Sequence, residues 1–125
     1  MRILLDSHTA LWWMDDPDKI KKEAREAIAN PDNQVYLSAA SVWELGLKRA
    51  KGKLKLPDNF AELLRADGVD ELPFTHAHAT RSLILPPIHG DPFDRALIAQ
   101  CQTESLHFAT RDQFAPEYQI AILPV

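Results

Sequence analysis

Four aspartates of this chain stand at places where strands and helices would bring them together. The segment "HGDPFDRALIAQ" (89–100) places Asp91 and Asp94 at the start of a predicted helix. Asp6 ends the first apolar run, "RILLD", and Asp112 follows the run "LHFAT" by two residues. Carboxylate oxygens are the ligands that Mg²⁺ and Mn²⁺ prefer in proteins. These positions therefore predict a site for a divalent metal.

Asp94 differs from Asp91 in the direction that helical geometry gives its side chain. With Asp91 as the N-cap residue and Pro92 as the first helical residue, Asp94 falls on the apolar arc of the helix. That arc is formed by Phe93, Leu97, Ile98 and Cys101. A carboxylate on a buried face is costly unless it is compensated, either by a metal or by a modified capping box in which Asp94 accepts from the N–H of its own N-cap residue. We expect Asp94 to bind metal and Asp91 to cap the helix, with metal binding by Asp91 as an alternative role.

Glu44, in "SVWELGLK", is a further acid with two possible roles, a salt bridge to Lys48 or a place in the cluster of acids at the rim of the sheet. Glu44 and Lys48 are spaced i, i+4 in the order that favours a salt bridge on a helix. The apolar arc of this helix is expected to contain Val42, Trp43, Leu47 and Ala50, with Glu44 at its border. Carboxylates that meet at one rim raise each other's pKa, and a divalent cation relieves this repulsion.

The elements that must position these acids alternate between strand and helix. Apolar runs predict strands at 2–6, 34–38, 71–74, 106–110 and 119–123. Caps, prolines and helical periodicity predict helices at 16–30, 38–52, 57–68, 75–85 and 91–105. This alternation indicates a three-layer α/β/α sandwich with a mostly parallel sheet of about five strands. Ligands of such sheets bind beyond the carboxyl ends of the strands, where the acids are expected.

Composition narrows the classes of function. The 125 residues, 46% of them hydrophobic, suit one domain, 1–125, with a packed core. The net charge of −4 excludes binding of nucleic acid by bulk charge, so a polyanion would be held by a local patch such as 48–55, or by bound cations. No apolar run is long enough to cross a membrane. The single cysteine, Cys101, forms no disulfide within the chain and fits a cytoplasmic protein.

Four segments in this order resemble PIN-domain ribonucleases, and among them the VapC-type toxins of type II toxin–antitoxin systems. The segments are "LLDSHTALWW", "SAASVWELGLKRAKGKL", "HGDPFDRALIAQ" and "FATRD", and the resemblance runs from Ile3 to about Phe114. The resemblance implies a five-stranded parallel sheet between helices and endonucleolytic cleavage of RNA that depends on Mg²⁺ or Mn²⁺. It also implies a homodimer, and neutralisation by a small antitoxin whose tail occupies the groove near the acids.

The same resemblance suggests roles for individual residues. The core acids of the family match Asp6, Glu44, Asp94 and Asp112, and Asp91 belongs to the "DPFDR" variant of one branch. Three further residues are candidates to support the site or to contact the substrate, namely Thr110, Arg95 and Lys48. Arg95 is equally compatible with a solvent-facing salt bridge.

Two other classes of function fit parts of the pattern. One is a phosphate-transfer enzyme on a similar sheet, but a haloacid-dehalogenase-type phosphatase needs a second aspartate two residues after Asp6, where His8 stands. A response-regulator receiver needs an aspartate that closes its third strand, and "ELPFT" has none there. The other class is a non-catalytic partner-binding module that keeps the acids only for folding and assembly.

Overall fold

A parallel sheet of five strands forms the centre of the computed structural model, which describes all 125 residues. The strands lie in the order β3-β2-β1-β4-β5. Their bounds are β1 Arg2–Leu5, β2 Gln34–Ser38, β3 Val69–Leu72, β4 His107–Thr110 and β5 Ile122–Pro124. Leu5 pairs with Leu37 of β2 and with Ala109 of β4, so the residues after these three strands meet at one edge of the sheet.

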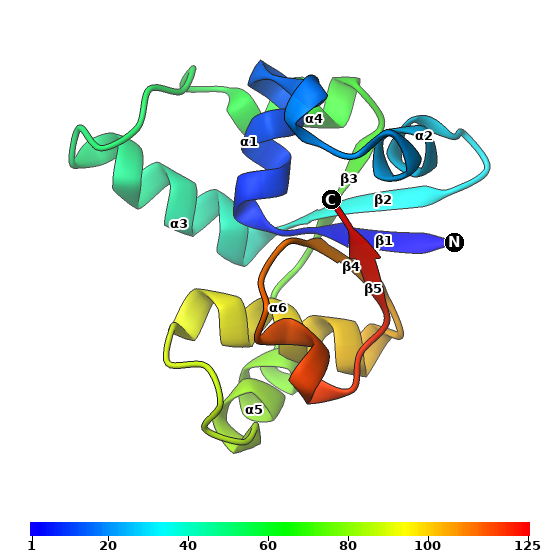
Figure 1. Cartoon of the computed structure of the whole chain (residues 1–125). Coiled ribbons are helices and arrows are strands. Elements are labelled where there is room, and N and C mark those ends of the chain that lie inside the picture. The colour runs from blue at the N-terminus through cyan, green and yellow to red at the C-terminus, as the bar shows by residue number, and fades with distance from the viewer.

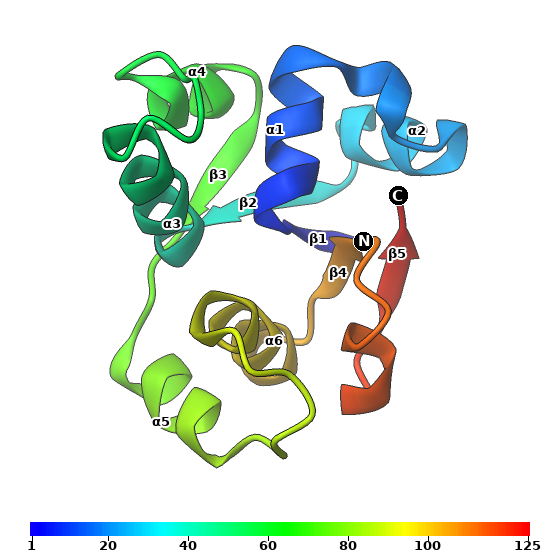
Figure 2. The same ribbon diagram turned by 60° about the vertical axis from the view of Figure 1, so that its left-hand side comes forward.

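Helices cover both faces of the sheet, which confirms the expected three-layer fold (Figure 1, Figure 2). On one face lie α1 (Ser7–Asp15), α2 (Lys22–Ala29) and α4 (Phe60–Ala66), and on the other lie α5 (His76–Ile84) and α6 (Pro92–Glu104). The helix α3 (Ala39–Ala50) leaves the carboxyl end of β2 and contacts both α1 and α6. Short 3₁₀ turns occur at Pro17–Lys19 and Ala115–Tyr118. No helix combines the length and the apolar character that crossing a membrane requires.

The central strand shows why its apolar run is continuous. Leu4 faces the core layer that contains Leu97 and Phe108, whereas Ile3 and Leu5 face the opposite layer. All five of these side chains are buried. Side chains of a strand alternate between the two faces, and a sheet covered on both faces therefore needs apolar residues at successive positions.

The helix expected over 16–30 is broken into two parts, so that expectation is wrong in its first half. The chain makes a 3₁₀ turn at Pro17–Lys19, passes through extended backbone at Ile20, and begins α2 at Lys22. Ile20 is 1% exposed and lies in the core layer beneath α1 and α2. Burial of this side chain explains the break, because tertiary packing outweighs local helix propensity.

Two strands are displaced from their expected positions. β3 ends at Leu72, two residues before the expected end, because Pro73 has no N–H to donate to the sheet. β5 starts at Ile122 instead of 119, since Gln119 adopts a left-handed conformation (φ 59°) that closes the preceding 3₁₀ turn. Both strands remain in the sheet, so the topology is unaffected.

The helix α1 is not expected from the sequence, and it begins directly after β1. Asp6 is its N-cap residue, and its Oδ1 accepts a hydrogen bond of 2.7 Å from the N–H of Thr9. The two tryptophans of this helix, Trp12 and Trp13, are half-buried and pack against the core layer of β1. An N-cap aspartate at the end of an apolar strand is the signal that identifies this helix start.

Candidate active site

The start of α6 is fixed by Asp91. Its Oδ1 accepts hydrogen bonds from the N–H of Phe93 (2.8 Å) and of Asp94 (3.3 Å), which confirms the expected cap. The N–H of Asp91 donates to Nδ1 of His89 at 3.1 Å. That N–H is the donor that a modified capping box would direct to Asp94. The structure thus removes the capping box as an explanation for the position of Asp94.

Three side chains meet in front of this helix start. Nε2 of His89 lies 3.1 Å from Oδ2 of Asp94 and 3.0 Å from Oδ2 of Asp112. One atom from each of the three residues falls within 4.8 Å of the others, so the two carboxylates converge closely enough to share one cation. Asp94 arrives from α6 and Asp112 from the segment after β4.

His89 was not singled out by the sequence, although it lies only five residues before Asp94 in "HGDPFDR". Because its Nδ1 accepts from the N–H of Asp91, the neutral ring carries its proton on Nε2 and donates to the two carboxylates. The backbone N–H of His89 donates to the hydroxyl of Tyr118 at 2.7 Å. The rings of His89 and Phe114 pack edge to face. The ring is therefore held on several sides.

The charge of Asp94 is poorly compensated. The pKa of Asp94 is raised from 3.8 to about 7, chiefly by burial and next by the neighbouring charge of Asp91. The carboxylates of Glu44 and Asp112 act in the same direction, whereas His89 lowers the pKa. A carboxylate with this pKa lies among like charges, which is the setting in which a bound cation is favoured.

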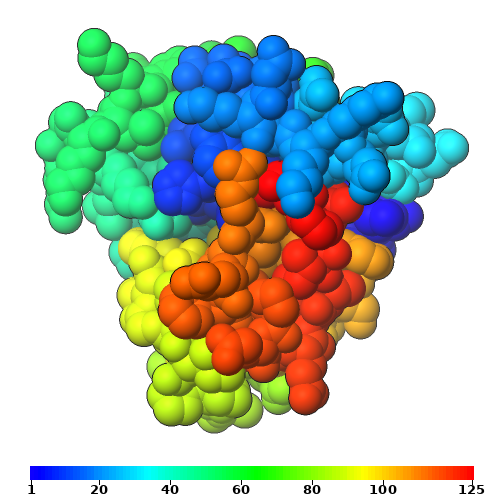
Figure 3. All heavy atoms as spheres, viewed as in Figure 1, coloured from blue at the N-terminus to red at the C-terminus, as the bar shows by residue number.

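Asp6 is joined to Asp112 through Thr110. The hydroxyl of Thr110 donates to Oδ2 of Asp6 and accepts from the N–H of Asp112 at 3.0 Å. Oδ1 of Asp112 accepts from the N–H of Phe114 at 2.9 Å, so its Oδ2 is directed to His89. Figure 3 shows the segment after β4 (orange) reaching towards α1 (blue) beside the C-terminal strand (red). Asp6 lines the same pocket but lies outside the cluster of His89, Asp94 and Asp112.

Glu44 is buried, with only 7% of its surface exposed, and both of its oxygens are engaged. Oε1 accepts from the hydroxyl of Ser7 at 2.6 Å, and Oε2 pairs with Nζ of Lys48 at 3.1 Å, which confirms the expected salt bridge. The prediction of the buried arc on α3 is wrong, since Trp43 is 64% exposed and Leu47 is 39% exposed. The face of α3 turned inward instead contains Ala40, Ser41, Glu44 and Leu45. The hydrogen bond from Ser7 explains how an acid is accommodated there.

Arg95 points away from the acids. Its guanidinium donates to backbone oxygens of the segment before α6, those of Ser82, Leu85, Pro86 and His89. Arg95 thereby holds the segment that carries His89, and it forms none of the salt bridges of the chain.

Two cations of the basic run 48–55 are engaged in ion pairs. Lys48 pairs with Glu44, and Arg49 pairs with Asp58.

The acids open into a pocket of about 480 Å³. It is lined by Asp6, His8, Trp12, His89, Asp94, Arg111 and Asp112. Carboxylates from three separate segments converge in it, and two further acids, Asp91 and Glu44, are close enough to raise the pKa of Asp94. Such an arrangement can hold a divalent cation and, through that cation, a phosphate group.

Comparison with known proteins agrees with this geometry. The model of the PIN domain family matches residues 3–118. The chain is 29% identical over 114 residues to "Ribonuclease VapC22" of Mycobacterium tuberculosis, a match that covers 89% of this chain and 87% of that protein. The fold resembles VapBC2 from Rickettsia felis bound to a DNA fragment from their promoter, with a TM-score of 0.72 and 15% identity over 99% of this chain and 98% of that one. It also resembles FitAcB from Neisseria gonorrhoeae, with a TM-score of 0.62 and 24% identity over 98% and 96% of the two chains. With a family model that matches almost its whole length, the chain belongs to the PIN domain family.

Proposed function

We propose that this chain is a metal-dependent endoribonuclease and the toxin of a toxin–antitoxin pair, acting as one cytoplasmic domain. The observation that carries the proposal is the convergence of Asp94 and Asp112 on one donor, with the pKa of Asp94 raised to about 7. Membership of the PIN domain family and the similarity to "Ribonuclease VapC22" support a nuclease that acts on RNA.

The donor set fits Mg²⁺ or Mn²⁺. Asp94 and Asp112 would hold the ion directly and Asp6 would complete the site. In its alternative role as a ligand, Asp91 would use Oδ2, because its Oδ1 caps α6. When bound, the ion supplies positive charge that neutralises the phosphodiester and makes water more acidic. Nε2 of His89 lies between the two carboxylates. Its N–H therefore occupies a position between them that a bound cation would also favour. The proton of His89 points into the pocket, which makes the ring a donor and not a metal ligand.

The remaining residues of the site orient these groups. Thr110 fixes the carboxylate of Asp6 relative to the backbone N–H of Asp112. Ser7 and Lys48 hold the carboxylate of Glu44 between them, close to Asp94, where it orients water or completes the ion site. Rigid placement of this kind is what a reaction that depends on positioning and electrostatics requires.

The test is cleavage of structured RNA with Mg²⁺ or Mn²⁺ by the wild type and by Asp94→Asn. We expect cutting that depends on the metal and is reduced at least about a hundredfold in the variant, the size of loss typical for a group of this kind. Asp32→Asn is the matched control, because Asp32 is exposed in the turn before β2 and should leave cleavage unchanged. Equal activity in Asp94→Asn would reject the assignment of Asp94. Absence of cleavage in every protein would favour the partner-binding module.

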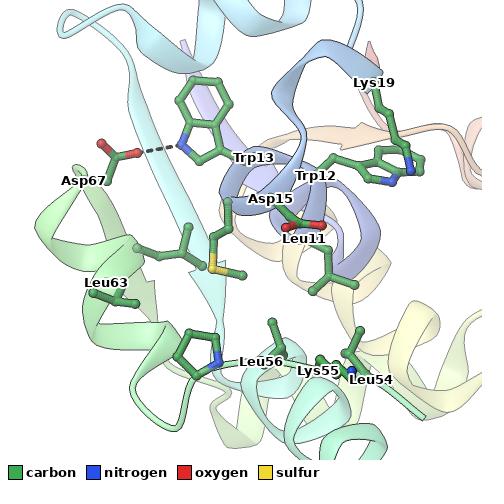
Figure 4. A pocket seen from close by; sticks show the side chains of 13 residues that line it. Leu11, Trp12, Trp13, Asp15, Lys19, Leu54, Lys55, Leu56, Leu63 and Asp67 are labelled. Carbon is green, nitrogen blue, oxygen red and sulfur yellow. Dashed lines mark hydrogen bonds between the residues drawn. The ribbon is translucent and has the colours of Figure 1, made fainter.

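An apolar pocket next to the site is suited to the antitoxin. It has a volume of about 540 Å³ and lies between α1, the segment 54–57 and α4 (Figure 4). Trp13 closes one side by donating to Oδ2 of Asp67 at 2.8 Å, and Trp12 lies on another side of α1, beside Lys19. Trp12 also lines the acidic pocket, so a chain seated on the apolar surface could extend directly to the acids.

If the gene has a small neighbouring reading frame, as a toxin–antitoxin pair requires, co-expression with its product tests the antitoxin role. Leu63→Glu places a charge in the apolar pocket, at a side chain that is 48% exposed, and should prevent co-purification and restore toxicity. Ala121→Glu places the same charge at an exposed residue before β5, away from this pocket, and serves as the control. Co-purification that Leu63→Glu does not change would place the antitoxin on another surface.

A further inference from the structure

The acidic pocket has a second wall that carries no acid. His8 and Trp12 come from α1, and Arg111 comes from the segment between Thr110 and Asp112. The three side chains line the same pocket as Asp6, Asp94 and Asp112. None of them is needed to hold a metal. We call His8, Trp12 and Arg111 the cationic–aromatic wall.

Arg111 is fixed in place by contacts that involve none of the acidic side chains of the pocket. Its Cζ lies 4.3 Å from the centre of the Trp12 ring, the geometry of a cation–π contact. Its Nε donates to the backbone oxygen of Val125 at 3.1 Å, and its Nη2 donates to the backbone oxygen of Lys19 at 2.6 Å. These bonds leave Nη1 unused. A permanent positive charge is thus presented beside several carboxylates without being neutralised by them.

His8 continues the wall on the same helix. It lies four residues before Trp12, and the two rings are stacked with centres 6.0 Å apart and an angle of 26° between their planes. His8 is exposed, so its ring is accessible to a ligand, whereas Trp12 is half-buried. An exposed ring in a stack of this kind is a surface on which a nucleobase can lie.

We propose that the cationic–aromatic wall binds the nucleotide next to the phosphodiester that is cleaved, with Arg111 on its phosphate and His8 against its base. The inference rests on the proposed ribonuclease function. A metal held by Asp94 and Asp112 neutralises only the reacting phosphate, and this chain carries a net charge of −4. The neighbouring phosphates of an RNA strand therefore need a cation of their own, and Arg111 is the one presented in the pocket.

A purely structural role for Arg111 would be to fasten the end of β5 to the turn before α2. Both of its hydrogen bonds to backbone oxygens contribute to that role. A residue that only fastened these segments would affect the melting temperature and not the salt dependence of RNA binding. The two roles therefore make different predictions for one substitution.

The experiment measures binding of a short fluorescein-labelled single-stranded RNA to the Asp94→Asn protein, which should not cleave it, over a range of salt concentrations. Adding Arg111→Gln should weaken binding about tenfold and reduce the slope of log K against log salt by about 0.7, the contribution of one phosphate contact. Arg111→Lys keeps the charge and should retain that slope. Arg81→Gln removes the same charge on α5, where Arg81 donates to Oε1 of Gln102, about 12 Å along α6 from Asp94, and it should change neither quantity.

The stacking contact is tested separately. His8→Ala should weaken binding of the labelled RNA several-fold, and His8→Phe, which keeps a flat ring, should not. In cleavage by the otherwise unaltered enzyme, Arg111→Gln should raise KM much more than it lowers kcat. The circular-dichroism spectrum of each variant checks that it is folded. If Arg111→Gln does not fold, His8→Ala carries the test, because the side chain of His8 is exposed.

The outcomes distinguish the inference from the proposed function. If the wild type neither binds nor cleaves RNA, both are wrong. If the wild type cleaves RNA but Arg111→Gln has the wild-type KM and salt slope, this inference alone is wrong. A lower melting temperature with an unchanged salt slope would likewise assign Arg111 to folding and overturn the inference.

Discussion

Asp94 and Asp112 share a single hydrogen-bond donor, with Oδ2 of Asp94 at 3.1 Å and Oδ2 of Asp112 at 3.0 Å from Nε2 of His89. The two acids are eighteen positions apart in sequence (112 − 94) and come from different elements. Their common partner means that neither carboxylate is placed independently of the other. A change at one of the three residues should therefore alter the response of the whole cluster to metal.

His89→Leu removes the shared donor and leaves the two carboxylates facing each other. At about pH 8 the metal-free variant should melt at a lower temperature than the wild type, because like charges then repel without compensation. Millimolar Mn²⁺ should raise the melting temperature more in this variant than in the wild type, since the ion relieves a larger repulsion. Differential scanning fluorimetry with and without Mn²⁺ gives both values.

His89→Gln is the matched variant, because its amide nitrogen can occupy the position of Nε2. It should fall between the wild type and His89→Leu in both measurements. Identical Mn²⁺ shifts in the three proteins would show that His89 has no influence on the ion site.

The pH dependence of stability should report the raised pKa of Asp94. Between about pH 4 and pH 7 the folded protein binds a proton at Asp94 that the unfolded chain has lost, so stability falls as the pH rises through this window. Above pH 7 Asp94 is ionised in the folded protein as well, and the full free-energy penalty of placing its charge in this site is present. The side chain is 32% exposed, so screening by solvent should reduce the penalty to about 1 kcal/mol.

Asp94→Asn removes this penalty. Its melting temperature should exceed that of the wild type by about 3–6 °C near pH 8 and match it near pH 4. Melting curves over this range, recorded with EDTA to exclude metal, provide the comparison. A variant that is less stable than the wild type at pH 8 would contradict the assigned direction of the pKa shift.

The hydroxyl of Ser7 should make a measurable contribution to stability, because it donates to a carboxylate that is only 7% exposed. Ser7→Ala should lower the free energy of unfolding in urea by about 1.5–3 kcal/mol, the range for a hydrogen bond to a charged group. Ser82→Ala loses a bond to the neutral backbone oxygen of Ala79 and should cost about 0.5–1.5 kcal/mol. Equal losses in the two variants would mean that Glu44 does not depend on Ser7.

A homodimer, which the resemblance to VapC-type toxins implies, would use an apolar surface around α3 and α5. Leu83 is 82% exposed and Ile84 67%, and Trp43 of α3 lines a pocket together with Phe74 and Ser82. Leu83→Lys should convert a dimer to a monomer in sedimentation velocity, because it places a charge in the centre of the interface.

Leu63→Lys, on the opposite layer of the sheet, is the control and should leave the dimer intact. A wild type that sediments as a monomer would reject the dimer itself. A dimer that Leu83→Lys leaves unchanged would place the interface elsewhere.

The sequence alone was enough to predict the sheet and its class. The runs at 2–6, 34–38 and 106–110 are apolar at successive positions, as strands covered on both faces must be, and all three are strands close to these limits. Alternation with helices then predicts parallel pairing, and helical phase turns Asp94 towards the sheet. These predictions depend on local periodicity and on short-range capping, which are properties of neighbouring residues.

The positions of the other groups depended on tertiary structure. Ile20 interrupts a helix because a core layer accepts its side chain, and Trp43 is exposed because Ser7 provides a partner for Glu44 on the inward face. The place of His89 follows from Asp91, Tyr118 and the two acids together, and no spacing rule connects these residues. Periodicity thus determined most of the elements, though not α1, and which acids reach one edge of the sheet. Only packing between distant segments determined that a histidine joins two of those acids and that Arg111 faces them.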